Sequence, residues 1–319
     1  MRVKYVVCAA VGLVALAGAA GMVLAQRGGG GAAGGGGIGG GGTGFGRSNR
    51  TGIRREVQGQ RMGPDGLLYT VPERHEGIPP DRAGTPDWKR AEGFKSDGFT
   101  FARMRWKSYR FGDAYLTDYP ACDLNFSFRL QELTSIKVNP TPVLLSFTDE
   151  QLYDYPMVYM EEVATLVFSD EEVAGLRKYL LNGGFLMVED FWGVDAWKSF
   201  HDQMKRVFPD KEPTDLPLEH PIFHAVFDLK ERPQIPGIDQ WARWGESEPE
   251  RTWERPDAKT PEYWAYFDNK GRMMALICHN TDLGDGWQRE GDSEEYFHRF
   301  SEKLGYPMGV NIVFYVMTH

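Results

Sequence analysis

The segment from Ser169 to Gly193 constrains the fold more strongly than any other part of the chain. It reads SDEEVAGLRKYLLNGGFLMVEDFWG. Ser169 and Glu172 have the spacing of a capping box, and apolar residues follow at helical intervals. Gly183 and Gly184 then end the helix, and an apolar run, FLMV, begins at once. An amphipathic helix that leads directly into a strand buried on both faces is part of a βαβ unit, which predicts a parallel sheet.

The same alternation of helix and strand patterns extends over residues 99–319. Short apolar runs predict strands at 99–106, 142–147, 156–160 and 185–188, and amphipathic stretches predict helices that start at the N-cap Asp123, at 195–208 and at 292–304. YWAYF and RMMALICHN flank the turn residues DNKG and predict a hairpin. The last apolar run, GVNIVFYVM, is rich in β-branched residues but has helical spacing, which favours a helix. We therefore expect an α/β domain of three layers, with a mostly parallel sheet covered by helices on both faces.

Residues 1–25 have the pattern of an export signal. Arg2 and Lys4 precede an apolar stretch, and VLA stands before the expected cleavage after Ala25. Gln26 follows in place of the cysteine that a lipid anchor requires. The alternative is an uncleaved membrane anchor, because the apolar stretch approaches the length of a bilayer span. Both interpretations place the rest of the chain outside the cytoplasm, in the periplasm or secreted.

Residues 26–98 differ in amino-acid composition from the chain that follows. A glycine tract, GGGGAAGGGGIGGGGTGFG, leads into polar sequence rich in proline and arginine. Such sequence buries too little apolar surface to offset the entropy lost on ordering, which predicts a flexible, disordered leader. One short element, LLYTV at 67–71, is a candidate for folding back onto the domain. The predicted organisation is a signal at 1–25, a leader at 26–98 and a domain at 99–319.

The composition argues against a nucleic-acid partner and does not show whether the cysteines form a disulfide. The formal net charge is -9 and the pI is near 5.4. Nucleic-acid binding requires a basic stripe, and the sequence of the domain has none. Outside the signal the cysteines are Cys122 and Cys278, which we expect to be buried thiols, although the sequence does not show whether they meet.

Polar residues gather where three predicted strands end. In open α/β sheets ligands bind beyond the carboxyl ends of the strands, and MVYMEE, FLMVEDFW and ICHNTD each carry acidic or amide side chains to that rim. A pocket of carboxylates, imidazole and indoles suits a small polar or sugar-like ligand. The candidate ligand-binding residues are Glu161, Glu189, Asp190, Trp192, His220, Asn280, Asp282 and Trp287.

Each candidate also has a purely structural interpretation. Asp190 stands shortly before a predicted helix and could cap it. His220 precedes Pro221, where the imidazole often bonds the backbone of a tight turn. Asn280 and Asp282 could shape their own loop through local hydrogen bonds, and the tryptophans are by default packing residues.

The sequence lacks the usual motifs of catalytic and metal sites. Cys278 has no small residues two positions away on either side, as a nucleophile elbow requires, and no GxSxG occurs. Carboxylates and imidazoles at Asp190, His220, His279 and Asp282 suit zinc or manganese but lack a metal-binding spacing. Residues 280–286 have part of the pattern of a calcium loop without its closing glutamate. We expect no metal and no cofactor.

Five ordered segments resemble one bacterial family. They are YPMVYM, FSDEEVAGLRKYLLNGGFLMVEDFWG, FPDKEPTDLPLEHPIFHAVFDL, ALICHNTDLGDGW and LGYPMGVNIVFYVMTH. In this order they resemble the domain of unknown function 4159 family, over about 99–319. The resemblance implies a class I glutamine amidotransferase-like, flavodoxin-like fold. It does not imply amidotransferase activity, because Glu189, Asp190 and Phe191 stand where those enzymes have their nucleophilic cysteine.

These observations give two expectations of function. The first is an exported, non-catalytic binding or scaffolding module of the bacterial cell envelope, with a polar and aromatic crevice at the carboxyl ends of the strands. The resemblance adds an expected protein partner, since family members resemble parts of envelope systems that contain AAA ATPases and von Willebrand A-type domains. The alternative is a hydrolase in which Asp190 and His220 act as acid and base.

Overall fold

The computed structural model describes residues 60–62, 68–70, 77–79, 81–89, 98–110 and 112–319. All of them fall in one unit, Ser48–His319. The predicted signal at 1–25 and most of the predicted leader lie outside the described residues. No helix in the described ranges is both long enough and apolar enough to cross a membrane.

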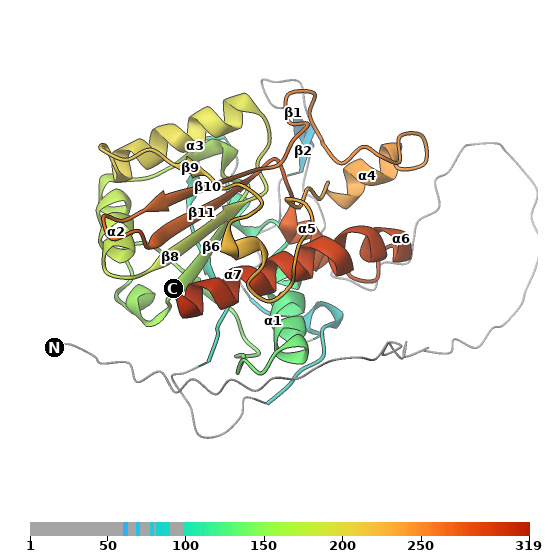
Figure 1. The fold of residues 1–319 in the computed structure, drawn as a ribbon, viewed down its shortest axis with the longest axis horizontal. Helices are drawn as coiled ribbons and strands as arrows, with labels where there is room; N and C mark the ends of the chain where they lie inside the picture. The colour runs from blue at the N-terminus through green and yellow to red at the C-terminus, as the bar shows by residue number, and fades with distance from the viewer. Residues whose placement is uncertain (1–59, 63–67, 71–76, 80, 90–97, 111) are drawn as a thin grey trace, which may run out of the picture. The chain divides into compact units, whose positions relative to one another are not determined.

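One seven-stranded sheet forms the centre of the domain (Figure 1). Its strands lie in the order β5 (Val143–Leu145), β3 (Ala102–Met104), β6 (Met157–Glu161), β8 (Phe185–Glu189), β11 (Met273–His279), β10 (Glu262–Phe267) and β9 (Thr214–Asp215). The first five strands are parallel, and β10 is antiparallel to both of its neighbours. Counted along the chain, the five parallel strands have the order 2-1-3-4-5, which is that of flavodoxin-like sheets. The predicted mostly parallel sheet is confirmed.

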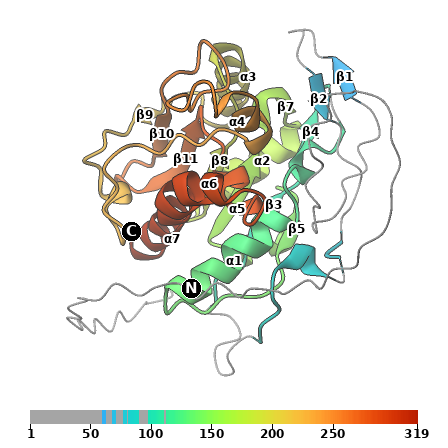
Figure 2. The same ribbon diagram turned by 90° about the vertical axis from the view of Figure 1, so that its right-hand side faces the viewer.

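Helices cover both faces of this sheet, as predicted. Along β8 the side chains alternate: Leu186 and Val188 pack with α2 (Asp170–Leu181) and α3 (Val194–Val207), whereas Phe185 and Met187 pack with α1 (Ala121–Leu133) and α7 (Tyr306–Thr318). Figure 2 shows α1 and α7 on the near side of the sheet and α2 behind it. The domain therefore has two apolar cores separated by the sheet.

The remaining elements connect or flank these layers. The helices α4 (Ile238–Trp244), α5 (Leu283–Gln288) and α6 (Glu294–Tyr296) belong to the carboxyl-terminal half, where the π-helix η6 (Phe297–Gly305) leads into α7. Short pairs are formed by β1 (Gln60–Met62) with β2 (Leu68–Thr70) and by β4 (Lys107–Ser108) with β7 (Leu166–Val167). The 3-10 turns are η1 (Arg82–Gly84), η2 (Ala114–Leu116), η3 (Glu150–Asp154), η4 (Val163–Thr165) and η5 (Pro221–Phe223).

Several local predictions are confirmed. The hydroxyl of Ser169 accepts a hydrogen bond from Glu172 N–H at 3.2 Å, and the Glu172 carboxylate accepts one from Ser169 N–H at 2.7 Å. The predicted hairpin is β10 and β11, with Gly271 at φ 83° in its turn. The ambiguous last run is helix α7. Cys122 and Cys278 are both buried, free thiols.

Two local predictions are wrong for identifiable reasons. The strand predicted at 99–106 is only Ala102–Met104, because Phe99 forms an isolated bridge to Val138 outside the sheet. Asp123 is not an N-cap, since α1 begins at Ala121 and Asp123 lies in its first turn. Its carboxylate is used instead to neutralise a buried guanidinium, as described below.

Part of the predicted leader packs on the domain. Arg82 Nη2 donates to Pro140 O at 2.6 Å, and Trp88 Nε1 donates to Val138 O at 3.0 Å. The Trp88 ring also lies 5.8 Å from that of Phe128. The folded region therefore begins before the predicted boundary at residue 99. The LLYTV element pairs through β2 with β1 and not with the central sheet.

Gly175 provides a test of how α2 packs against the segment that follows β5. A methyl group at this position would lie 2.1 Å from Phe147 O, a backbone atom that cannot move aside cheaply. Gly175→Ala should therefore lower the free energy of unfolding by about 1–3 kcal/mol, although alanine is normally the better helix former. Gly112→Ala is the control, because no atom lies within 4 Å of the added methyl group. Urea denaturation of both variants measures the difference, and equal stabilities would contradict this packing.

Candidate functional site

Glu161, at the carboxyl end of β6, is an ion-pair partner of Arg103 on β3. The same guanidinium bonds Asp123 of α1, with Nη2 2.5 Å from Asp123 Oδ1, and all three side chains are buried. Burial is the main influence on the Glu161 carboxyl and raises its pKa, while the Arg103 charge opposes that rise. The carboxyl group of Glu161 is therefore engaged with a buried guanidinium.

Glu189, at the carboxyl end of β8, caps helix α5. Its Oε2 accepts a hydrogen bond from Leu283 N–H at 2.6 Å, and its Oε1 accepts one from Gly284 N–H at 3.1 Å. The Tyr159 hydroxyl contacts both Glu189 and Glu161, but one O–H can donate to only one carboxylate. If the Tyr159 hydroxyl donates to Glu161, a proton on Glu189 allows Glu189 to donate to the Tyr159 oxygen. Burial, above all, raises the pKa of Glu189 to about 8, in agreement with that state.

Asp190 does not cap the helix that follows it. Helix α3 begins after Gly193, and its Val194 N–H donates to Asp257 Oδ2 at 3.1 Å. Asp190 Oδ1 instead accepts a hydrogen bond from the Trp192 indole at 3.1 Å, in a backbone conformation with φ 52°. The structural alternative considered for Asp190 from the sequence is therefore wrong. Its carboxyl group stays at the rim of the sheet.

Three aspartates converge beside the first turn of α5. One carboxylate oxygen from each of Asp118, Asp282 and Asp285 lies within 4.8 Å of the others, and all three residues are buried. Asp282 is the N-cap of α5, where its Oδ1 accepts from Asp285 N–H at 2.6 Å. Asp118 comes from the connection between η2 and α1. The group thus joins the segments that follow β3 and β11.

Glu254 belongs to the same group of acids. A Cβ atom at Gly237 would lie 3.0 Å from Glu254 Oε1, 3.2 Å from Asp282 Oδ2 and 3.3 Å from Asp285 Oδ2. A side chain at position 237 would therefore crowd these oxygens by a few tenths of an ångström. Gly237 N–H also donates to Glu254 Oε1 at 2.7 Å, which holds that carboxyl in place.

We refer to six side chains together as the carboxylate cluster: Asp118, Glu162, Asp190, Glu254, Asp282 and Asp285. Burial and repulsion from neighbouring acids raise the pKa of four of them, namely Glu162, Asp190, Glu254 and Asp282. Burial first, then Asp118 and Glu254, raise the pKa of Glu162 to about 8. Burial likewise raises the pKa of Glu254 to about 7, and burial followed by repulsion from Asp190 and Asp285 raises the pKa of Asp282.

Among the described residues, acids outnumber the basic side chains that pair with this cluster. Within the described residues, Arg289 is the guanidinium that pairs directly with a member, with Nε 2.8 Å from Asp285 Oδ1, and it also contacts Asp292. Asp285 Oδ2 accepts from Ile238 N–H at 2.7 Å. Asp282 Oδ2 and Asp190 Oδ2 have no hydrogen-bond donor among the described residues, although the two residues are only 5% and 7% exposed. The cluster is therefore rich in acceptors and poor in donors.

Three further candidates have structural roles. Asn280, at φ 61°, accepts from Gly193 N–H and donates to Thr260 O, so its amide ties two loops together. Trp192 is buried and donates to Asp190, as described above. Trp287 is buried under α5, with its ring 4.6 Å from that of Phe126.

His220 is not brought to the rim. It is the N-cap of η5, where its Nδ1 accepts from Ile222 N–H, and its ring lies 5.6 Å from that of Tyr315. Tyr315 is in the last turn of α7, whereas Tyr306, at the other end, contacts Trp287 of α5. Nine residues of helix separate the two ends by about 13 Å. In Figure 1 the chain end marked C lies at the end of α7 away from α5.

The model of one protein family matches residues 100–317, under the description Domain of unknown function (DUF4159). The chain belongs to this family. A comparison with curated proteins gives no match. The DUF4159 domain thus comprises the whole central sheet and the carboxylate cluster, so the site described here is a feature of the matched region.

Four of the six acids in the DUF4159 cluster were missed as candidates from the sequence. Asp118 and Glu254 stand in irregular segments without periodicity, and Asp285 had been considered only as part of a local calcium loop. Glu162 follows β6 directly and lies at the predicted rim, but Glu161 was preferred. An acidic residue directly after a buried strand can be predicted from the sequence as a site residue. No local sequence pattern identifies Asp118 or Glu254.

The raised pKa of Glu189 predicts unequal effects of two substitutions. Glu189→Gln keeps an oxygen for Leu283 N–H and supplies an N–H for the Tyr159 oxygen, but it leaves Gly284 N–H without an acceptor, so it should lower the free energy of unfolding at pH 7 by only about 1–2 kcal/mol. Glu189→Ala leaves two buried N–H donors without acceptors and should cost about 2–4 kcal/mol. Chemical denaturation distinguishes them. A glutamine variant as unstable as the alanine variant would show that Glu189 is ionised.

The raised pKa values also predict how stability depends on pH. In the folded domain the pKa is about 8 for Glu162, about 8 for Glu189 and about 7 for Glu254. The ordinary pKa of a glutamate is 4.5. Between these limits the folded state binds more protons, so its stability falls as pH rises. With metal ions removed by a chelator, the melting temperature should be lower at pH 8.5 than at pH 5.5. A rise over this window would contradict the assignment.

Proposed function

We propose that the DUF4159 domain is a non-catalytic binding module and that its carboxylate cluster binds a divalent cation. The observation that carries this proposal is that Asp282 Oδ2 and Asp190 Oδ2 accept no hydrogen bond from the described residues, although both residues are almost fully buried and other acids surround them. Buried carboxylates must be neutralised by protons or by cations. A bound cation would neutralise several of them at once and supply the missing partner.

The ligand types favour a hard cation. The cluster offers carboxylate oxygens and no thiolate or imidazole, a set that suits calcium, magnesium or manganese better than zinc. Oxygens on opposite sides of a calcium ion are about 4.6–5.2 Å apart. The oxygens of Asp118, Asp282 and Asp285 lie within 4.8 Å of one another, which is compatible with that ion.

Neighbouring groups orient the proposed ligands. Asp285 N–H holds one oxygen of Asp282, and Ile238 N–H and Arg289 hold the two oxygens of Asp285. Such outer contacts fix the direction of a carboxylate and leave its remaining lone pairs for a metal. Asp118 comes from a different segment than Asp282 and Asp285, so the proposed site does not need a contiguous calcium-loop motif.

The contacts of His220 favour this proposal over the alternative hydrolase. An acid and base pair must be within hydrogen-bond reach of one substrate. The side chain of His220 contacts Tyr315 and Ile222, and no contact joins it to Asp190 in the described part of the chain.

Export and an envelope partner belong to the same proposal. The signal-like residues 1–25 support a location in the periplasm or outside the cell, where calcium is more abundant than in the cytoplasm. The family resemblance supports a partner from a system with AAA ATPases or von Willebrand A-type domains. Detection of the protein in a periplasmic or secreted fraction, and not with the cytoplasm, tests the location.

Calcium should stabilise the domain most where its ligands are ionised. At a concentration 100-fold above the dissociation constant, binding adds about 2.7 kcal/mol, which raises the melting temperature of a domain of this size by roughly 5–10 °C. The shift should be larger at pH 8 than at pH 5.5, because protons compete with the cation. Thermal unfolding with calcium, magnesium or manganese, and with a chelator, measures it.

Asp282→Asn is the decisive variant, because asparagine can still cap α5 while it removes one charged ligand. We expect it to fold and to lose most of the calcium-dependent shift. Asp195→Asn, at an exposed position in the first turn of α3, is the matched control and should retain the full shift. Equal shifts in both variants, or no binding of any of the three ions by titration calorimetry, would refute the proposal.

A further inference from the structure

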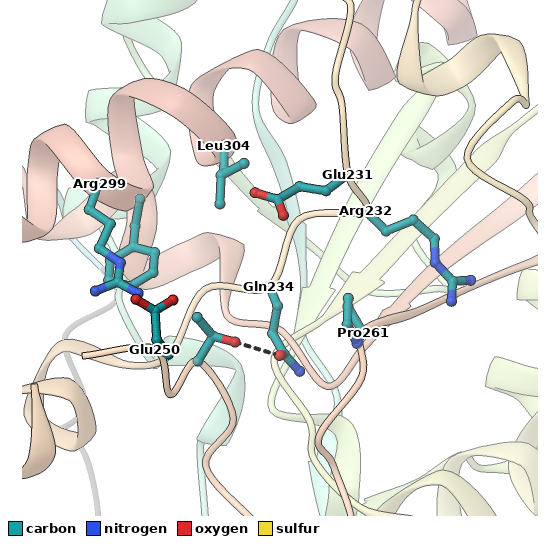
Figure 3. Close-up of a pocket in the computed structure, with 9 residues that line it drawn as sticks. Glu231, Arg232, Gln234, Glu250, Pro261, Arg299 and Leu304 are labelled. Carbon is teal, nitrogen blue, oxygen red and sulfur yellow. Dashed lines mark hydrogen bonds between the residues drawn. The ribbon is translucent and has the colours of Figure 1, made fainter. Parts of the chain in front are cut away.

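A second pocket, of about 320 Å³, lies apart from the carboxylate cluster (Figure 3). It is lined by Glu231, Arg232 and Gln234, by Glu250 and Thr252, by Pro261, and by Arg299, Phe300 and Leu304 of the π-helix η6. None of the six acids of the cluster lines it. Its volume is at the lower end of the range for small-molecule sites.

Charges of both signs face this pocket without partners. The Arg299 guanidinium has no hydrogen bond or ion pair among the described residues, and its only ring contact places it 5.0 Å from the centroid of Phe300. The carboxylates of Glu231 and Glu250 likewise have no bonded partner there. Arg232 differs, because its Nη1 bonds Asp215 Oδ1 at 2.8 Å. One guanidinium and two carboxylates are thus available to a ligand.

The wall between these charges is fixed. Gln234 is buried, and its Nε2 donates to Ala258 O and Asn280 O, both at 3.0 Å. Its Oε1 accepts from the Thr252 hydroxyl at 2.7 Å, the bond drawn in Figure 3. With both of its amide N–H groups used, Gln234 shapes the pocket and offers a ligand no donor. Phe300, Leu304 and Pro261 add an apolar surface.

We propose that this pocket binds a small zwitterion of the amino acid or short peptide class. Its carboxylate would pair with Arg299 and its ammonium group with Glu231 or Glu250. Figure 3 shows Arg299 with Glu250 at one side of the space, and Glu231 on a different wall. A ligand with only a negative charge would pair with Arg299 but would also face the two carboxylates. A ligand with only a positive charge would pair with a carboxylate but would also face Arg299. The apolar surface then accommodates a side chain.

This inference does not depend on the proposed cation site. Binding is therefore tested in the presence of a chelator, by titration calorimetry of the full domain with dialanine and with each of the common free amino acids. N-acetyl-dialanine lacks the ammonium group, and dialanine amide lacks the carboxylate. We expect at least one zwitterion to bind, and its two capped forms to bind about tenfold or more weakly, since each loses a charged hydrogen bond.

Two variants test which side chains bind the carboxylate and the ammonium group of the ligand. Arg299→Gln should weaken binding of the zwitterion by about tenfold or more, and Glu231→Gln with Glu250→Gln should remove the preference for a free ammonium group. Arg243→Gln, at a guanidinium bonded to Gln240 on α4, is the matched control and should bind normally. Thermal unfolding checks that each variant folds. No binding of any zwitterion up to about 10 mM, or equal binding to the Arg299 variant, would overturn the proposal.

Discussion

The guanidinium of Arg103 is the group on which the centre of the structure depends. It is fully buried on β3, next to the middle of the sheet, and a buried charge requires partners of opposite sign. Asp123 of α1 and Glu161 of β6 supply them, and the carbonyls of Tyr115 and Thr117 accept its remaining N–H groups. One side chain thereby holds the first turn of α1 and the end of β6. It also holds the connection that carries Asp118.

A second chain of contacts extends from this charge to α5. Glu161 contacts Tyr159, Tyr159 contacts Glu189, and Glu189 bonds the first N–H groups of α5. Each link uses a carboxyl group to satisfy a buried donor, so Glu161 and Glu189 serve the scaffold. The acids of the cluster differ, because they lie just beyond this network and their charges are only partly balanced. Asp118, Glu162 and Asp190 also have positive φ, a strained conformation that often accompanies functional sites.

The fold could largely be predicted because its signals are local. The capping box at Ser169, the glycines after α2 and the apolar run of β8 lie within one stretch of chain, and their order implies a parallel sheet. The predictions failed where a distant residue intervened. Asp123 has the sequence context of an N-cap, but Arg103 binds its carboxylate, and Trp88 stands in leader-like sequence but packs near α1.

The sequence by itself determined that Glu161, Glu189, Asp190 and Asp282 would stand at the carboxyl ends of parallel strands, because strand direction follows from the βαβ order. Only the tertiary structure decided what each acid does there. Glu161 and Glu189 meet buried donors, whereas Asp190 and Asp282 meet other acids brought from separate segments, including Asp118 and Glu254. The physical reason is that a carboxyl group's role depends on whether its neighbours in space donate protons or repel charge. Those neighbours are remote in the chain.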